Sequence, residues 1–94
     1  MGDVFDNGGE LMDGKRPGLV KHHILSVSIY PEYRDEAMNH IWMSAYDHTM
    51  NGERCPHGSL PRIRQAWNRW LRDCRPEQFR WANEHSRRAL DLGE

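Results

Sequence analysis

The residues of this chain best suited to chemistry are its histidines and cysteines. A zinc site needs about four such ligands, usually supplied as two close pairs. Cys55 and His57 form one close pair, in a loop held by Pro56. The other candidates, His48 and Cys74, fall on two separate predicted helices, and Cys74 lies on an apolar helix face. Because this spacing does not supply two close pairs, we expect no metal site and no cofactor.

Two further histidines, His22 and His23, are adjacent in a predicted strand. Neighbouring side chains in a strand point to opposite faces, so this pair is not expected to chelate one ion. Nucleophilic catalysis by Cys55 would need a base beside it, and nothing except the nearby His57 supports such an arrangement. The chain shows no paired carboxylates in a predicted pocket wall and no glycine-rich phosphate loop after a strand. We therefore expect a protein that is not an enzyme.

Arginine and tryptophan gather in the second half of the chain. Residues 62–88 hold eight arginines, no lysine and three acidic side chains, whereas the first fourteen residues hold four acids and no base. Three of the four tryptophans, Trp67, Trp70 and Trp81, lie among these arginines. Both residue types are common where proteins bind other proteins or nucleic acids. This segregation indicates a binding surface, although the formal net charge of the whole chain is only −1.

One long strand is expected before the helices. From Leu25 to Ile29 apolar and polar residues alternate and β-branched residues are frequent, and Pro31 ends the run. We place the strand at residues 20–30, near the start of a single compact domain of residues 19–94.

The predicted strand has no convincing partner within the chain. The N-terminal segment of residues 1–18 is rich in glycine and is expected to be flexible, although Asn7 and Gly8 give a weak hairpin signal. Because unpaired strand edges attract other strands, we expect a homodimer paired around Val27, or addition of the strand to a partner's sheet.

Three helices are expected after the strand. The first covers residues 34–50, and its apolar arc is so wide that we interpret it as the central helix, the alternative being a free flank that binds. Ser59 is expected to cap the second, which ends near Arg75. The third opens at Pro76 and fades near Gly93. The predicted fold class is α+β: a small, mostly helical domain in which three helices follow one long N-terminal strand.

Positions on a helical wheel separate core faces from binding faces. The inward stripes are Leu60, Ile63, Trp67, Leu71 and Cys74 in the second helix, and Phe79, Ala82, Ser86, Ala89 and Leu90 in the third. The opposite faces carry Arg62, Arg69 and Arg72 in the second helix, and Trp81, His85 and Arg88 in the third. A tryptophan opposite the core is typical of an interface anchor, unless a second layer covers it. The arginine face is either solvated or a ridge for phosphates or carboxylates. These six residues are the predicted partner-binding site.

Together these patterns favour a non-catalytic protein-binding module. Small chains rich in Trp and Arg but without motifs are typical of phage or mobile-element accessory proteins, many of which inhibit or regulate a larger host enzyme or defence complex. The alternative is a nucleic-acid-binding regulator using the arginines of the second and third helices, although Glu77 and Glu84 interrupt that face. We also expect a cytoplasmic protein without a membrane segment, because the chain shows no signal peptide, no long apolar run and only two cysteines.

Overall fold

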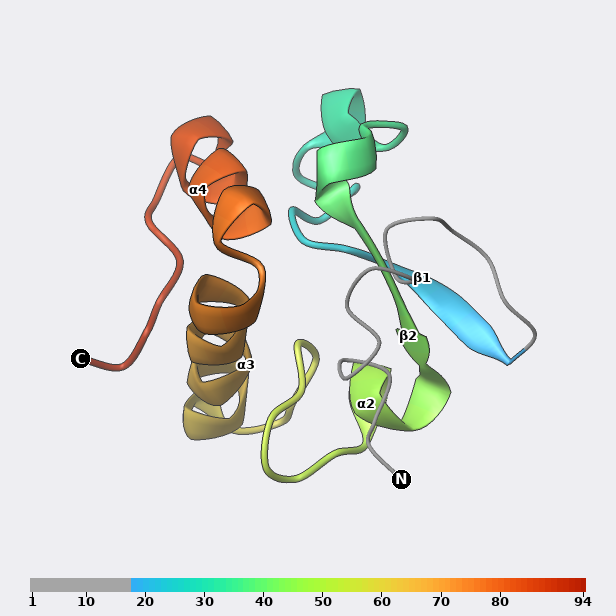
Figure 1. Cartoon of the computed structure of the whole chain (residues 1–94), viewed down its shortest axis with the longest axis vertical. Helices are drawn as coiled ribbons and strands as arrows, with labels where there is room; N and C mark the ends of the chain where they lie inside the picture. Colours follow the sequence, from blue (N-terminus) through green and yellow to red (C-terminus); the bar gives the residue numbers. More distant parts are fainter. Residues whose placement is uncertain (1–17) are drawn as a thin grey trace.

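Two short strands and three α-helices make up most of the regular structure in residues 18–94, the part of the chain that the computed structural model describes. In chain order the elements are β1 (Leu19–His23), η2 (Pro31–Tyr33), η3 (Ala37–Asn39), β2 (His40–Ser44), α2 (Ala45–Thr49), α3 (Pro61–Cys74) and α4 (Pro76–His85), the two η elements being single 3-10 turns. Figure 1 shows α3 and α4 on one side of the molecule and the two crossing strands on the other. The predicted α+β class is therefore confirmed.

The two strands pair antiparallel, and their register decides which side chains reach the core. Val20 lies opposite Met43, and His22 lies opposite Ile41. Residues paired in this way share one face of a sheet. Ile41 and Met43 are completely buried against Trp67 and its neighbours on α3, so this face is the core face. His22, which is only 4% exposed, is therefore a polar residue inserted among apolar ones.

The predicted strand at residues 20–30 is too long at its C-terminal end. β1 ends at His23, and the alternating residues after it form a turn, in which the amide of Ile29 donates to the carbonyl oxygen of Ser26 at 3.1 Å. Val27 lies in this turn, so the predicted strand pairing around Val27 is wrong. Alternation of polar and apolar residues was misleading because serine side chains also stabilise turns.

Asn39 explains why the strand stops where it does. Its side chain accepts a hydrogen bond from the amide of Leu25 at 2.7 Å and donates to the carbonyl oxygen of Leu25 at 3.1 Å. The backbone groups that a longer strand would offer to a neighbour are thus satisfied by a side chain. Within the described residues β1 pairs with β2, so the reason given for a homodimer is lost, and the homodimer itself stays a prediction. The expected flexible segment and its Asn7-Gly8 hairpin signal lie at residues 1–17, outside the described part.

The predicted first helix at residues 34–50 is wrong over most of its length. Its central part is β2, and only Ala45–Thr49 is α-helical. Burial along β2 alternates, with Ile41 and Met43 buried and Trp42 between them only half-buried. The wide apolar arc has a simple cause, because a strand drawn on a helical wheel spreads its two faces around the circle.

The second predicted helix is confirmed as α3. Its buried stripe contains Ile63, Trp67, Trp70 and Leu71, and the last three of these pack with Ile41 and Met43 on the core face of the sheet. Leu60 and Cys74 were predicted to point inward, but both are exposed because they sit at the ends of the helix. Ser59 does not cap the helix, which instead begins at Pro61 after Leu60.

The third predicted helix is confirmed as α4, but it is shorter than expected. It ends at His85, and residues 86–94 run back along α3, as Figure 1 shows. Asn68 of α3 donates to the carbonyl oxygen of Asp91 at 2.8 Å. The carbonyl oxygen of Asp91 thus has a hydrogen-bond donor even though the helix does not continue to supply a backbone amide. Of the predicted inward stripe, Ala82 is buried, Phe79 and Leu90 pack against the core, and Ser86 and Ala89 lie beyond the helix end.

Candidate functional site

The predicted arginine face of α3 is used largely within the chain. Nη1 of Arg69 donates to the carbonyl oxygen of Leu92 at 2.6 Å. Arg72 contacts the carboxylate of Asp73 at 2.9 Å and that of Glu94 at 3.0 Å. Both arginines therefore hold neighbouring or C-terminal groups of the same molecule. Arg62, the third predicted residue of this face, is exposed at the first turn of α3.

Trp81 is half-buried, between a helix neighbour and a 3-10 turn. Its indole stacks on the ring of His85, with centroids 4.6 Å apart, and meets the ring of Tyr33 edge-on at 5.3 Å. Tyr33 in turn stacks on Tyr30 at 6.1 Å. We call these four residues, Tyr30, Tyr33, Trp81 and His85, the aromatic surface. The turn η2 is thus the layer that partly covers Trp81.

Arginines border the aromatic surface where α4 ends. The backbone amide of Arg87 donates to the hydroxyl of Tyr30 at 2.9 Å, and its guanidinium lies 5.5 Å from the centre of that ring. Arg88 is exposed, but it lies beyond the helix end and so does not share a helical face with Trp81. Sequence reasoning missed the role of Tyr30 because the turn that brings it to α4 was predicted as strand.

Three histidines that are far apart in the sequence meet beside the core face of the sheet. His22 comes from β1, His48 from α2 and His57 from the loop after α2, and one ring nitrogen of each lies within 4.8 Å of the other two. We call them the histidine cluster. Nε2 of His48 and Nδ1 of His22 are hydrogen-bonded at 3.1 Å. The centroid of the His57 ring lies 5.1 Å from that of His22 and 4.5 Å from that of His48.

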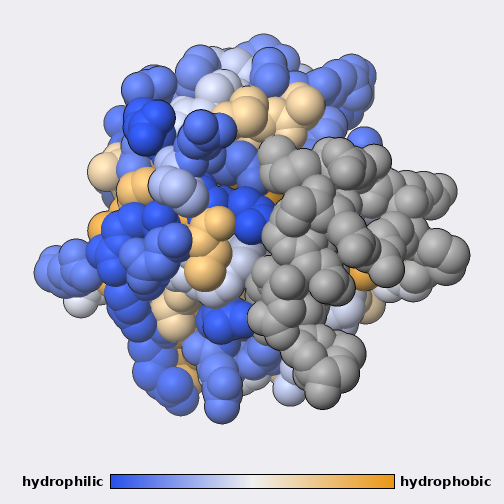
Figure 2. Space-filling view, in the orientation of Figure 1, coloured by the Kyte–Doolittle hydropathy of each residue, from blue (hydrophilic) through white to orange (hydrophobic). Residues whose placement is uncertain are grey.

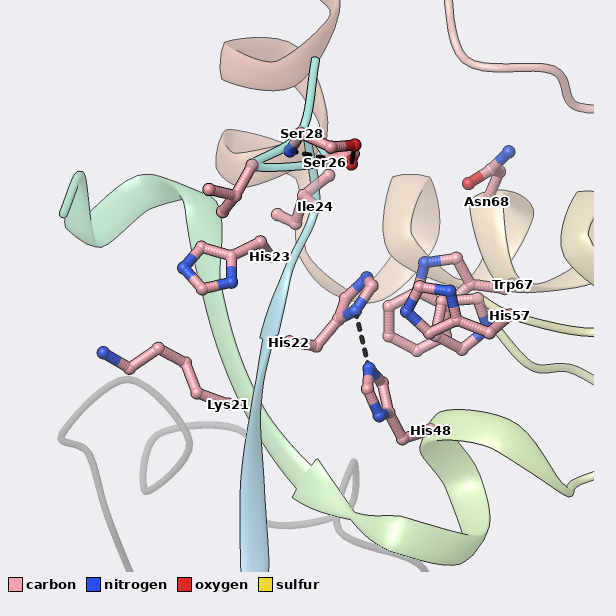
Figure 3. A pocket seen from close by; sticks show the side chains of 12 residues that line it. Lys21, His22, His23, Ile24, Ser26, Ser28, His48, His57, Trp67 and Asn68 are labelled. Carbon is pink, nitrogen blue, oxygen red and sulfur yellow. Dashed lines mark hydrogen bonds between the residues drawn. The ribbon is translucent and has the colours of Figure 1, made fainter. Parts of the chain in front are cut away.

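Figure 3 shows His22 pointing toward His48 while His23 points to the other side of β1. The expectation that His22 and His23 cannot share one ion is consistent with this arrangement. The spacing of His48, His57 and the two cysteines, on which the prediction of no metal site rests, does not include His22. Only the pairing of β1 with β2, which leads directly into α2, brings His22 to the other two histidines.

The loop that carries His57 is anchored on both sides. Sγ of Cys55 donates a hydrogen bond to the carbonyl oxygen of His48 at 3.1 Å. The backbone amide of Cys55 donates to the carbonyl oxygen of Ile63 at 3.4 Å. Gly58 closes the turn with a bond to the carbonyl oxygen of Cys55 at 3.1 Å. A Cβ at Gly58 would lie 2.5 Å from Cγ2 of Ile63, so the close approach of this loop to α3 requires glycine. His57 is held between these anchors.

A cleft of about 350 Å³ lies beside the histidine cluster (Figure 3). Its lining includes the polar side chains of Ser26, Ser28 and Asn68, together with the ring of Trp67. Burial, with further effects from His48 and His57, lowers the pKa of His22 well below its usual value. Burial and His57 also lower the pKa of His48. His22 and His48 therefore favour the neutral form, whose ring nitrogens can act as ligands, and the cleft leaves open space next to them.

No protein-family model matches the chain, and comparisons with curated proteins and with solved structures find no match either. Among the helices in residues 18–94, none is long and apolar enough to cross a membrane. The function must therefore be inferred from the arrangement of the residues themselves.

Proposed function

We propose that this protein is a non-catalytic binding module that recognises a protein partner through the aromatic surface and the arginines beside it. The observation that carries the proposal is the state of Trp81, which is held on two sides by His85 and Tyr33 and still half-exposed. Tryptophan and arginine are the residues that most often dominate the energy of protein interfaces. A side chain already held in place also loses less conformational freedom on binding.

Charges on the two elements that form the aromatic surface favour a protein over a nucleic acid. Arg80 of α4 and Arg87 after it are exposed, but Glu84 of α4 and Glu32 of η2 are exposed as well. A polyanion would be repelled by these acids, whereas a protein partner can offer charges of both signs. The engagement of Arg69 with the C-terminal segment further weakens the case for a basic ridge along α3.

The distribution of apolar groups favours recognition by a few anchors. On the face of the molecule in Figure 2, apolar areas of the described residues are small and separated by hydrophilic ones. The large exposed apolar side chains of residues 18–94 come from different segments, namely Ile29, Tyr46, Met50 and Leu60. No broad apolar patch is thus formed by them, and binding energy concentrated on a preorganised Trp fits this surface better.

The partner in this proposal is a larger protein or nucleoprotein complex, which the chain inhibits or regulates in the manner of a phage or mobile-element accessory protein. A chain of 94 residues can act in this way simply by occupying a surface. Two free cysteines, Cys55 and Cys74, support a reducing compartment such as the cytoplasm.

The proposal is tested by substituting Trp81 and measuring partner binding. The partner is captured from host lysate in parallel with and without nuclease, and its affinity is then measured with purified protein. We expect Trp81→Ala to weaken binding by about 2 kcal/mol or more, which is roughly 30-fold in Kd. Trp42→Ala is the matched control, because Trp42 is also half-buried but lies on the outer face of the sheet.

Two outcomes would contradict the proposal. Equal affinities of the Trp81→Ala and Trp42→Ala proteins would remove the aromatic surface from the interface. A captured species that disappears with nuclease, and whose binding falls steeply as salt is raised, would show that nucleic acid is the ligand.

A further inference from the structure

The histidine cluster has the ligand set of an open zinc site. We propose that His22, His48 and His57 bind one Zn²⁺ ion through their imidazole nitrogens, leaving one coordination position toward the adjacent cleft. Three protein ligands with a water or other small ligand in the fourth position are a recurrent arrangement of zinc in proteins. The inference goes beyond the proposed partner binding, because the histidine cluster and the aromatic surface have no residue in common.

The separations of the ring nitrogens are close to those of a coordinated ion. A tetrahedral site with Zn–N distances of about 2.0–2.1 Å places its ligand nitrogens roughly 3.3 Å apart. Nε2 of His48 and Nδ1 of His22 are 3.1 Å apart, a separation close to that of two ligands of one ion. All three nitrogens lie within 4.8 Å of one another, so His57 needs to move by roughly 1.5 Å. His57 is exposed, which leaves its ring free to make this adjustment.

Ordinary core packing does not explain why a histidine is buried at position 22. This ring lies on the core face opposite Ile41 and edge-on to Trp67 at 5.7 Å, positions where an apolar residue would cost no desolvation. The hydrogen bond between rings of the cluster pairs a single nitrogen of His22 with one of His48. A metal ion would use the lone pairs of all three rings at once, which offsets the cost of burying His22.

A second histidine pair in the same sheet shows what sets the cluster apart. The ring centroids of His23 and His40 lie 5.0 Å apart, on the outer face of the sheet. Each of them, however, hydrogen-bonds the carbonyl oxygen of Arg34, at 3.0 and 2.7 Å respectively. Among the described residues, no third His, Cys, Asp or Glu joins that pair to form a ligand set. Three converging nitrogens occur in the histidine cluster alone within residues 18–94.

The chemistry of the ligands favours a borderline transition metal over calcium or magnesium. Imidazole binds zinc, copper and nickel well, whereas calcium and magnesium require oxygen ligands. Cys55 is not expected to coordinate, because its thiol is hydrogen-bonded to the carbonyl oxygen of His48. Coordination by nitrogen without sulfur is thus a specific feature of this site.

Titration of the full chain with zinc tests the inference. Purified protein is treated with a chelator, exchanged into buffer and titrated with ZnCl₂ in a calorimeter. We expect one equivalent to bind, and the melting temperature of the wild-type protein to rise with zinc. His57→Ala should weaken zinc binding at least about tenfold, since one of three ligands is lost. His85→Ala removes an exposed histidine from α4 and should bind zinc as the wild type does.

A second substitution and a spectroscopic readout make the test decisive. His48→Gln should also weaken zinc binding, and circular dichroism of both cluster variants should match that of the wild type. Co²⁺ bound in place of zinc should give the spectrum of nitrogen ligation without a thiolate charge-transfer band. A wild-type Kd weaker than about 100 μM, undiminished binding by His57→Ala, or a thiolate band would each overturn the inference. Trp81→Ala should retain zinc binding, so failure of the partner proposal would be distinguishable from failure of this one.

Discussion

Gln78 joins α4 to the segment for which the sequence predicted a helix and the structure has a strand. The side chain is 2% exposed, and its Nε2 donates to the carbonyl oxygens of Met38 and His40 at 3.0 and 2.9 Å. In a continuous helix over residues 34–50, these two carbonyls would instead accept from the amides four residues later. Substitution of Gln78 therefore tests whether this segment is a strand.

The expected cost of Gln78→Ala follows from the bonds that it removes. Each hydrogen bond has a net worth of about 0.5–1.5 kcal/mol, and an unsatisfied buried acceptor costs about 1–3 kcal/mol. Both carbonyls are only partly buried, so water can replace some of the loss. We therefore expect a decrease of about 2–3 kcal/mol in the free energy of unfolding. In a domain of this size, that corresponds to a melting temperature lower by roughly 8–24 °C.

This loss is measured by urea unfolding, with tryptophan fluorescence as the signal. The slope of the unfolding free energy against urea concentration should equal that of the wild type if unfolding stays two-state. Gln65→Ala is the matched control, because Gln65 donates to Asp91 at 2.9 Å on the exposed surface. The control should change stability by about 0.5 kcal/mol or less. A Gln78→Ala protein no less stable than the Gln65→Ala protein would refute the reasoning and favour a helix at residues 34–50.

Two other predictions concern the C-terminal segment and acid stability. Arg69→Ala removes the hydrogen bond to the carbonyl oxygen of Leu92 and should lower the free energy of unfolding by about 1–2 kcal/mol. Limited proteolysis should then cut residues 86–94 faster, and unchanged protection would contradict the role given to Arg69. In chelator-treated protein, burial lowers the pKa of His22 and that of His48, so below pH about 6.5 the unfolded state binds protons that the native state does not. The free energy of unfolding should therefore fall as pH is lowered through about 6.5 toward 5, and urea titrations that give a flat profile would show that these rings are not held neutral.

Local sequence patterns were sufficient where one segment carries its own signal. The stripe containing Ile63, Trp67 and Leu71 repeats with helical spacing over several turns, and Pro61 and Pro76 mark where helices begin, so α3 and the start of α4 were predicted correctly. The segment of β2 has only five residues, too few for its alternation to outweigh the helical pattern of its neighbours. Its strand conformation comes from pairing with β1, which a reading of local sequence does not include.

The two candidate sites illustrate the same limit in different ways. Trp81 could be identified from its position opposite the core stripe of one helix, but its contact with Tyr33 depends on a turn far away in the sequence. The histidine cluster could not be identified at all, because its ligands come from β1, α2 and a loop that share no sequence pattern.

By itself the sequence determined the α+β class, the position of α3 and the concentration of Trp and Arg in the second half, since each of these depends on composition or on periodicity within one segment. The tertiary structure alone decided which residues meet. His22 and His48 are separated by 26 positions, and they touch because the register of β1 against β2 places His22 on the core face. A slip of one residue in that register would turn His22 to the outer face and leave His23 in its place. Register is set by the packing of Ile41 and Met43 against α3, and such long-range packing is not encoded in any single stretch of the chain.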